Sequence, residues 1–184
     1  MITVRLSSFL FLMVVIFSRL TGVQAQNIPI LFISDRDGNR EIYSMNEDGT
    51  NVIRLTNNPD EDSEPVWSPD GRQIAFTSKR EGDFAIYVMN ADGNNVRRVT
   101  TDAMSRTATS PAWSPDGRTL AFVSNTIIQS VNVDGTDLRR LTQADGEAYD
   151  PAWSPDGRQI AYALFQIDSS KIFVMLSLIH ISEP

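Results

Sequence analysis

Short apolar runs alternate with polar turn sequences along most of this 184-residue chain. The clearest runs follow the six-residue sequence Trp-Ser-Pro-Asp-Gly-Arg, which occurs unchanged at residues 67–72, 113–118 and 153–158. An apolar run such as Ile74-Ala75-Phe76 follows each copy, and a proline stands two residues before each tryptophan. Recurrence at intervals of about 40–50 residues indicates repeated supersecondary units that stack on one another.

The centre of each copy predicts a tight hairpin between two strands. In the first copy Pro69 presets φ, Asp70 can bond to its own backbone, and Gly71 can adopt a left-handed conformation. Apolar residues on both sides, Trp67 among them, favour strands there. The equivalent structural residues are Trp113, Pro115, Asp116 and Gly117 in the second copy and Trp153, Pro155, Asp156 and Gly157 in the third.

Two further strands are expected in each repeat. Residues 41–45 alternate in polarity and end at the turn sequence Asn46-Glu47-Asp48-Gly49, and a short strand ending in Thr56 follows. Four short strands in each repeat, separated by turn sequences, are typical of one blade of a β-propeller. The sequence therefore predicts an all-β fold, a partial β-propeller over residues 26–175 with about 3.5 four-stranded blades. The predicted blades are residues 30–71, 72–117, 118–157 and 158–175.

The repeat pattern is expected to stop after Met175. The earlier repeats have Asn-x-Asp-Gly at the corresponding place, whereas residues 176–184 have no counterpart in the other units and do not look native. We expect that the natural protein diverges here and that this chain is a fragment. A propeller protects its strand edges by closing its ring, so the fragment is expected to form an open arc.

Residues 1–25 have the pattern of a helical secretory signal peptide. Arg5 precedes an apolar segment over residues 9–17, and Val23-Gln24-Ala25 is typical of a cleavage site, which makes Gln26 the new N-terminus. The alternative is a membrane anchor, but the apolar segment is shorter than the about 20 residues that span a bilayer. We expect export to the periplasm or cell surface of a bacterium, with contact to the membrane only through the secretion signal.

Charge and composition limit the classes of partner. The chain has a net charge of −7 and contains no cysteine. An acidic surface argues against nucleic acid and anionic membranes as partners. Without cysteine the exported chain has neither disulfides nor thiol chemistry, so packed strands must supply its stability.

The repeats resemble a known family. Combinations such as Ile42-Tyr43 before Met45-Asn46, Arg54-Leu55-Thr56, and Pro65 before Trp67 look like the WD40-like (PD40) β-propeller repeat of the TolB type. The resemblance covers residues 30–175. It implies a six-bladed ring in an exported protein that binds proteins or peptides, commonly around the central channel.

Two repeated features invite a ligand-binding interpretation. The three tryptophans could stack on a ligand, but a tryptophan at one fixed place in every blade more often packs one sheet against the next. The Asp-rich turns could bind calcium, but an EF-hand loop with Gly49 at its sixth position would have Leu55 where the bidentate Glu is required. We therefore interpret both features as structural and predict no metal site.

The basic residues Arg36, Lys79 and Arg80 are the candidate partner-binding residues. Each follows the first strand of a predicted blade. If that strand lies on the propeller axis, these residues surround one basic mouth of the channel, and the Asp-Gly turns surround an acidic mouth at the opposite end. An ordinary solvated loop is the alternative for each of them.

Catalysis has little support in the sequence. The single histidine, His180, lies in the atypical tail, and the sequence has no Gly-x-Ser-x-Gly nucleophile motif. We predict no cofactor and a non-catalytic binding module that presents its channel mouth and loops to a protein or peptide partner. The alternatives are the propeller portion of a prolyl-oligopeptidase-type serine peptidase whose catalytic domain is missing, and a purely structural surface protein.

Overall fold

The computed structural model describes residues 28–101, 107–143, 146–166 and 169–177. The predicted helical signal peptide and residues 178–184 lie outside this range. The described residues form four antiparallel β-sheets and contain no helix, so the prediction of an all-β fold is confirmed. Accordingly, no helix that could cross a membrane occurs in this part of the chain.

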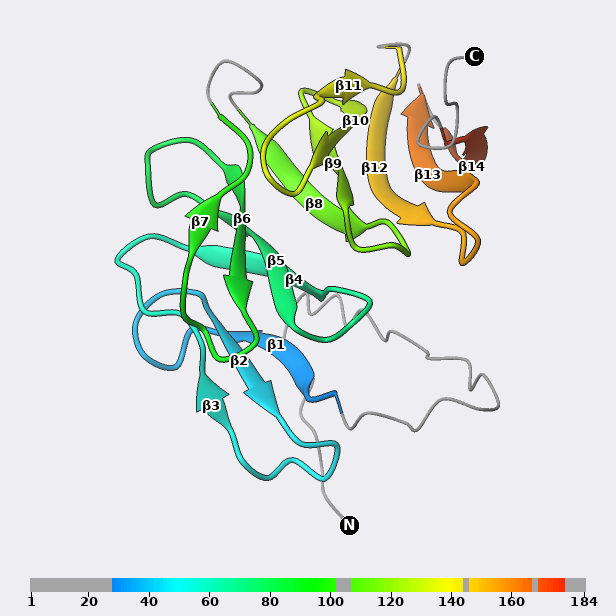
Figure 1. Ribbon diagram of the computed structural model, residues 1–184. Coiled ribbons are helices and arrows are strands. Elements are labelled where there is room, and N and C mark those ends of the chain that lie inside the picture. The colour runs from blue at the N-terminus through cyan, green and yellow to red at the C-terminus, as the bar shows by residue number, and fades with distance from the viewer. Residues whose placement is uncertain (1–27, 102–106, 144–145, 167–168, 178–184) are drawn as a thin grey trace.

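The four sheets follow one another along the chain and form an arc (Figure 1). Sheet I contains β1 (Ile30–Ser34), β2 (Glu41–Met45) and β3 (Ile53–Arg54). Sheet II contains β4 (Asp62–Trp67), β5 (Gln73–Ser78), β6 (Ala85–Asn90) and β7 (Arg97–Arg98). Sheet III contains β8 (Ala108–Trp113), β9 (Thr119–Ser124), β10 (Ile127–Asn132) and β11 (Arg139–Arg140). Sheet IV contains β12 (Glu147–Trp153), β13 (Gln159–Gln166) and β14 (Ser169–Leu176).

The predicted blade boundaries are wrong by one strand. The strand that ends in each tryptophan was assigned to the preceding blade, yet β4 pairs with β5, β8 with β9, and β12 with β13. The physical reason is the tight Pro-Asp-Gly turn, which returns the chain onto its own sheet, whereas the longer connection from β3 to β4 crosses between sheets. Boundaries at residues 71, 117 and 157 therefore divide hairpins.

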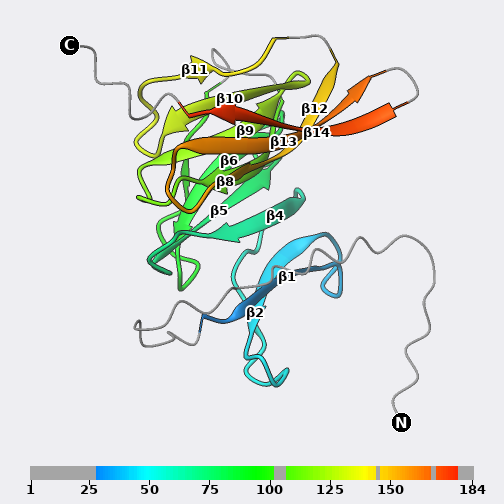
Figure 2. The same ribbon diagram turned by 90° about the vertical axis from the view of Figure 1, so that its right-hand side faces the viewer.

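The first strands of successive sheets lie side by side. β4 contacts β8, and β8 contacts β12, whereas the short last strands β3, β7 and β11 lie at the periphery (Figure 1). Figure 2 shows sheet I at one end of the stack, beside β4. The innermost position, which the sequence interpretation gave to the strand after the Pro-Asp-Gly turn, thus belongs to the strand before it.

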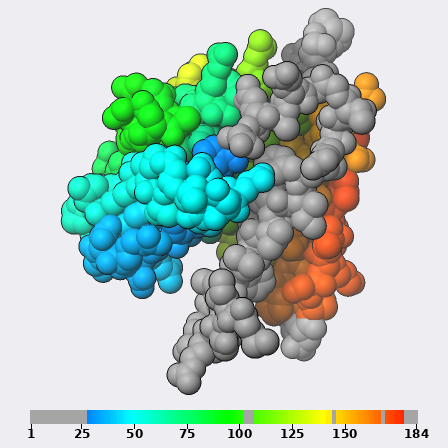
Figure 3. All heavy atoms as spheres, turned by 90° about the horizontal axis from the view of Figure 1, so that it is seen from below, coloured from blue at the N-terminus to red at the C-terminus, as the bar shows by residue number. Residues whose placement is uncertain are grey.

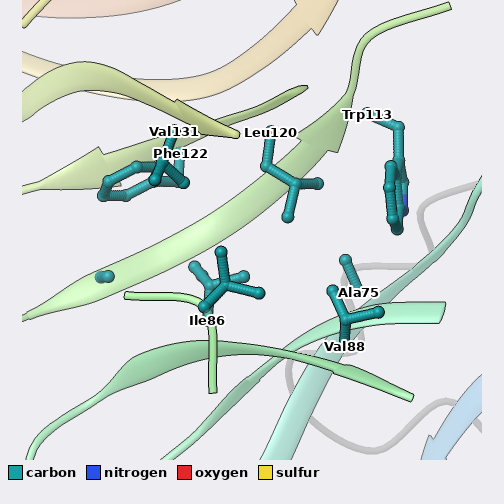
Figure 4. Packing of buried hydrophobic residues seen from close by; sticks show 9 residues of the cluster. Ala75, Ile86, Val88, Trp113, Leu120, Phe122 and Val131 are labelled. Atoms are coloured by element: carbon teal, nitrogen blue, oxygen red, sulfur yellow. The ribbon is translucent and has the colours of Figure 1, made fainter. Parts of the chain in front are cut away.

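Apolar side chains fill the spaces between sheets. The cluster between sheets II and III joins Ile86 and Val88 of β6 to Leu120 and Phe122 of β9, and all four are fully buried (Figure 4). Equivalent clusters lie between sheets I and II and between sheets III and IV. Because each sheet packs one of its faces against the neighbouring sheet, the core is a series of apolar layers between blades.

One glycine shows how closely the sheets approach each other. Gly93, in the turn after β6, has a φ of +84°, and a Cβ there would lie 2.6 Å from the carbonyl oxygen of Leu55, which directly follows β3 of the preceding sheet. A side chain would meet both a strained backbone and this carbonyl. The Asn-x-Asp-Gly turn is therefore also a packing element between blades.

The last sheet extends slightly further than predicted. β14 ends at Leu176, and the N–H of Ser177 donates to the carbonyl of Arg158 at 2.7 Å. Ala91 and Val133 make the same bond to Arg72 and Arg118 in sheets II and III. The backbone pattern of the repeat therefore continues two residues beyond Met175.

Candidate functional site

The three tryptophans, at the ends of β4, β8 and β12, join each of these strands to the sheet before it by a hydrogen bond. Their indole Nε1–H groups donate to backbone carbonyls of Pro29, Val66 and Ala112, respectively, at 2.8, 3.2 and 3.1 Å. Trp113 is only 8% exposed, and Trp67 and Trp153 are half-buried. A buried indole usually finds such an acceptor. The arrangement gives each tryptophan a packing role between blades.

The aspartates of the Pro-Asp-Gly hairpins bond within their own turns. The Oδ1 atom of Asp70 accepts the hydroxyl of Ser68 at 2.6 Å and the N–H of Arg72 at 3.1 Å. These two bonds, the hydroxyl bond most of all, lower the pKa of the Asp70 carboxyl. Asp116 and Asp156 make the same two bonds in the other hairpins.

The aspartates of the Asn-x-Asp-Gly turns are engaged in the same way. Asp48 accepts both the N–H and the hydroxyl of Thr50, at 2.9 and 2.6 Å, and Asp134 does so with Thr136. Bonds from Thr50, chiefly from its hydroxyl, lower the pKa of Asp48. Within the described residues, no three acidic or histidine side chains are grouped as a metal ion would require. These carboxylates act as turn residues.

The first strands enclose a groove, here named the central groove, with a volume of about 300 Å³. The whole Pro-x-Trp segment of β8 lines the groove, together with parts of the corresponding segments of β4 and β12. The lining residues are Ile28, Val66, Trp67, Ser68, Pro69, Pro111, Ala112, Trp113, Pro151 and Ala152. A concave, mostly apolar surface of this kind is the usual form of a binding site.

A bulge interrupts β4, β8 and β12, the first strands of sheets II to IV, just before the proline of each. Glu64, Ser110 and Asp150 have φ values of 53°, 53° and 48°, and the pairing with the second strand shifts at the same places. Left-handed non-glycine residues store strain and are common at functional sites. The Glu64 carboxylate accepts the N–H of Ser110 at 2.7 Å, so it joins sheet II to sheet III.

The predicted basic residues lie in loops one strand out from the central groove. Arg36 follows β1, and Lys79 and Arg80 follow β5, which is the second strand of its sheet. They therefore do not surround the channel mouth in the way that the predicted strand order required. Their role in binding a partner stays a prediction.

Arg36, Lys79 and Arg80 are each held against aromatic rings. The guanidinium carbon of Arg80 lies 5.2 and 4.9 Å from the ring centroids of Phe76 and Tyr87, and the ammonium of Lys79 lies 5.7 Å from that of Phe84. Arg36 contacts two rings of sheet I in the same way. The repeated aromatic residues at these positions were the sequence signal that could have indicated this arrangement.

Sequence reasoning missed the three arginines that end the hairpin motif. Arg72, Arg118 and Arg158 are exposed and adjoin the first-strand hairpins, whose residues Ser68 and Pro69 line the central groove. Their identical placement in three copies was the available signal. They add positive charge beside an end of the groove that was predicted to be acidic.

The stacked antiparallel sheets, with their first strands around a groove, define a β-propeller. The family description that matches residues 26–144 is the TolB beta propeller domain. This match covers more than half of the chain, so the chain belongs to the TolB β-propeller family.

Individual relatives agree with this assignment. The Tol-Pal system protein TolB of Geobacter sulfurreducens is 49% identical over 45 residues, which are 24% of this chain and 10% of that protein. Among solved structures, TolB from Acinetobacter baumannii has a TM-score of 0.69 at 27% identity and matches 81% of this chain and 38% of that one. A protein assigned as TolB from Agrobacterium tumefaciens has a TM-score of 0.71 at 25% identity, over 81% of this chain and 57% of that one.

The chain thus spans only part of the length of these relatives. Enzymes share the fold as well: a puromycin-hydrolysing peptidase of Mycobacterium tuberculosis has a TM-score of 0.64 at 20% identity, over 84% of this chain and 28% of that one. At that identity the likeness concerns the fold alone.

Proposed function

We propose that this chain is the partner-binding propeller of an exported periplasmic protein and that it holds a protein or peptide in the central groove without catalysing a reaction. The observation that supports this most is the groove itself. Three first strands present tryptophan, proline and alanine surfaces to one cavity of about 300 Å³. Aromatic and apolar surfaces at the centre of a contact, with polar groups around it, are typical of protein-binding sites.

The polar groups near the groove would orient such a partner. Glu64, Ser110 and Asp150 stand at the strained bulges of the three first strands, and Arg72 and Arg118 lie by the hairpins. An extended peptide could lay apolar side chains on the tryptophans and bond to these groups. The net charge of −7 speaks against nucleic acid as the partner.

The relatives suggest in which cell compartment the partner is found. The relative from Geobacter sulfurreducens is named as a protein of the Tol-Pal system. A periplasmic partner from that system fits the predicted signal peptide over residues 1–25, and nothing supports a location on the cell surface.

A peptidase propeller is the second candidate, supported by the fold shared with the puromycin-hydrolysing peptidase. In this case the propeller would accompany a catalytic domain. Sequencing the gene beyond the codon for Met175 separates the two: further PD40 repeats favour the binding module, and a hydrolase domain with a nucleophile motif favours the peptidase.

Site-specific photo-cross-linking in a bacterium that has a Tol-Pal system tests the proposed function. The cross-linker is placed at Ala112, which lines the groove, and in a control at Leu138, which is 38% exposed and lies outside the lining. We expect a covalent product with an envelope protein from position 112 and none from position 138. Equal labelling from both positions, or none from position 112, contradicts the proposal.

A further inference from the structure

Two buried acids lie where sheet I meets sheet II. The N–H of Asp62, at the start of β4, donates to the carbonyl of Arg40 at 2.9 Å, and Glu41 follows Arg40 at the start of β2. Both acids are fully buried. Glu41 and Asp62, here named the acid pair, therefore belong to the two sides of one interface between sheets.

The equivalent positions in the other two described interfaces are apolar. The same backbone bond runs from Ala108 to Phe84 between sheets II and III, and from Ala148 to Thr126 between sheets III and IV. The places of the acid pair are taken there by Ala85 with Ala108, and by Ile127 with Ala148, all of them buried. Apolar residues avoid the free-energy cost of burying a charge. The acid pair is thus a departure from the repeat that the fold itself does not require.

The two acids differ in how well their charges are compensated. Glu41 accepts three hydrogen bonds, at 2.6, 2.8 and 3.0 Å, from the hydroxyl of Thr56, the N–H of Asn58 and the guanidinium of Arg54. The Oδ2 atom of Asp62 accepts from Arg80 at 2.9 Å, but its Oδ1 atom accepts no hydrogen bond within the described residues. Asp62 is therefore the acid whose negative charge the fold supports less well.

The surroundings of Asp62 favour its neutral form. Burial raises the pKa of its carboxyl more than the neighbouring Ser78 and Arg80 lower it, and the charge of Glu41 adds to the rise. Arg54 of β3 pairs with Glu41, and the ring of Tyr87 of β6 lies against the Arg80 guanidinium. A carboxyl with a higher pKa in the folded than in the unfolded chain takes up a proton on folding. Lowering the pH from 7 toward that pKa therefore stabilises the folded state.

We propose that Asp62 makes the interface between sheets I and II responsive to acid: a proton from solvent bound to its carboxylate holds the two sheets together more firmly, and loss of the proton near neutral pH loosens them. The effect reaches the central groove. Trp67 of sheet II donates to the carbonyl of Pro29, just before sheet I, and both Trp67 and Ile28 line the groove. The inference does not rest on the proposed function, because it concerns how two sheets pack, whether or not the groove holds a partner.

Hydrogen exchange of the full chain at about pH 5 and pH 7 tests this inference. Each rate is divided by that of the unfolded chain at the same pH, so that only protection is compared. Peptides that cover β2 report on the interface with the acid pair, and peptides that cover β10 report on an interface without it. We expect β2 to be about threefold better protected at the lower pH and β10 to change by less than about twofold. Equal changes in the two strands, or no change in β2, overturn the proposal.

Variants assign the effect to one side chain. Asp62→Asn removes the titrating group but keeps the size of the side chain, so it should abolish the pH difference in β2. Asp60→Asn makes the same change at an exposed position two residues earlier and should leave the difference intact. The comparison of β2 with β10 in the parent chain needs no variant, so a folding defect of Asp62→Asn cannot conceal the result. A pH difference that survives in Asp62→Asn, or is lost in Asp60→Asn, also overturns the proposal.

Discussion

Sheets II and IV contain nearly the same strand sequence in different surroundings. In β6, Ile86 and Val88 are fully buried, whereas the aligned Ile172 and Val174 of β14 are 81% and 59% exposed. β6 lies between two sheets, and β14 lies in the last sheet of the described arc. Figure 3 shows sheet I, in blue and cyan, and sheet IV, in orange, on opposite sides of the molecule. The neighbouring sheet, more than the strand's own sequence, decides what is buried.

This difference indicates that the contacts between blades supply much of the stability of the fold. The three apolar clusters, the indole bonds and the approach of Gly93 to Leu55 all join one sheet to the next. An isolated blade of three or four short strands would expose both of its faces. The middle sheets should therefore be the most sensitive to substitution, and the terminal sheets the least sensitive.

The largest effect is expected from truncating the same side chain in the two environments. Ile86→Ala should lower the free energy of unfolding by about 2–5 kcal/mol, because it removes buried methyl groups and leaves a cavity. Ile172→Ala should change it by less than about 0.5 kcal/mol, because that side chain is already largely in water. Urea unfolding of both variants measures the difference. Similar losses of unfolding free energy in the two variants would contradict this, because they would mean that another surface buries β14 in solution.

The two stacked arginines allow a second comparison. Arg80→Gln should destabilise the fold by about 1.5–3 kcal/mol, since it leaves the buried carboxylate of Asp62 without its cation. Arg36→Gln, which removes no such pair within the described residues, should cost less than about 1 kcal/mol through its ring contacts. Thermal melting of the two variants gives the order. A greater loss from Arg36→Gln would show that Arg36 already has an anionic partner.

A smaller effect is expected from removing one bond between blades. Trp113→Phe keeps an aromatic ring but leaves the carbonyl of Val66 without its indole donor. The expected loss is about 1–2 kcal/mol, to which a lost hydrogen bond and a smaller ring both contribute. Trp153→Phe makes the same change at a half-buried position, and its loss should be smaller. Chemical unfolding at equal protein concentration compares the pair.

The smallest effect is confined to alkaline pH. Burial, more than any other cause, raises the pKa of Tyr87 to about 12. The unfolded chain would lose this proton near pH 10, so the contribution of Tyr87 to stability is complete below pH 10 and declines as the pH rises toward 12. Melting temperatures between pH 9 and 11 should fall more steeply in the parent chain than in Tyr87→Phe. Parallel curves would contradict the raised pKa.

The sequence predicted those features that depend on short-range chemistry. Pro69, Asp70 and Gly71 indicate their hairpin because each satisfies a local backbone requirement, and the hydrogen bonds of Asp70 are made within that turn. The fixed place of Trp67 and Trp113 within the repeat indicated a packing role, and the indole bonds toward the preceding sheets agree with it. Features that repeat in every blade could be read without knowledge of the sheet order.

The features that were missed depend on which strands become neighbours. The repeat period alone does not show where one blade ends and the next begins, so the predicted boundary at residue 71 was drawn through a hairpin that the Pro-Asp-Gly turn itself indicates. The bulges at Glu64 and Ser110 have φ values that the residue before a proline seldom adopts, so no propensity rule predicts them. The same error in strand order placed Arg36 and Arg80 at the channel mouth.

Hydrogen exchange, measured by mass spectrometry on peptides that cover β6 and β14, tests most directly whether packing between blades stabilises this fold. Both strands pair along their length with the preceding strand of their sheet, and β6 also pairs with β7 at Tyr87 and Val88, so the comparison uses the amides outside those two residues. At these amides the main difference between the strands is how far their faces are covered. Packing between blades predicts that the amides of β6 exchange at least tenfold more slowly than those of β14, because opening β6 requires separating two sheets. Equal protection of the two strands would contradict this explanation, because hydrogen bonds within each sheet would then suffice.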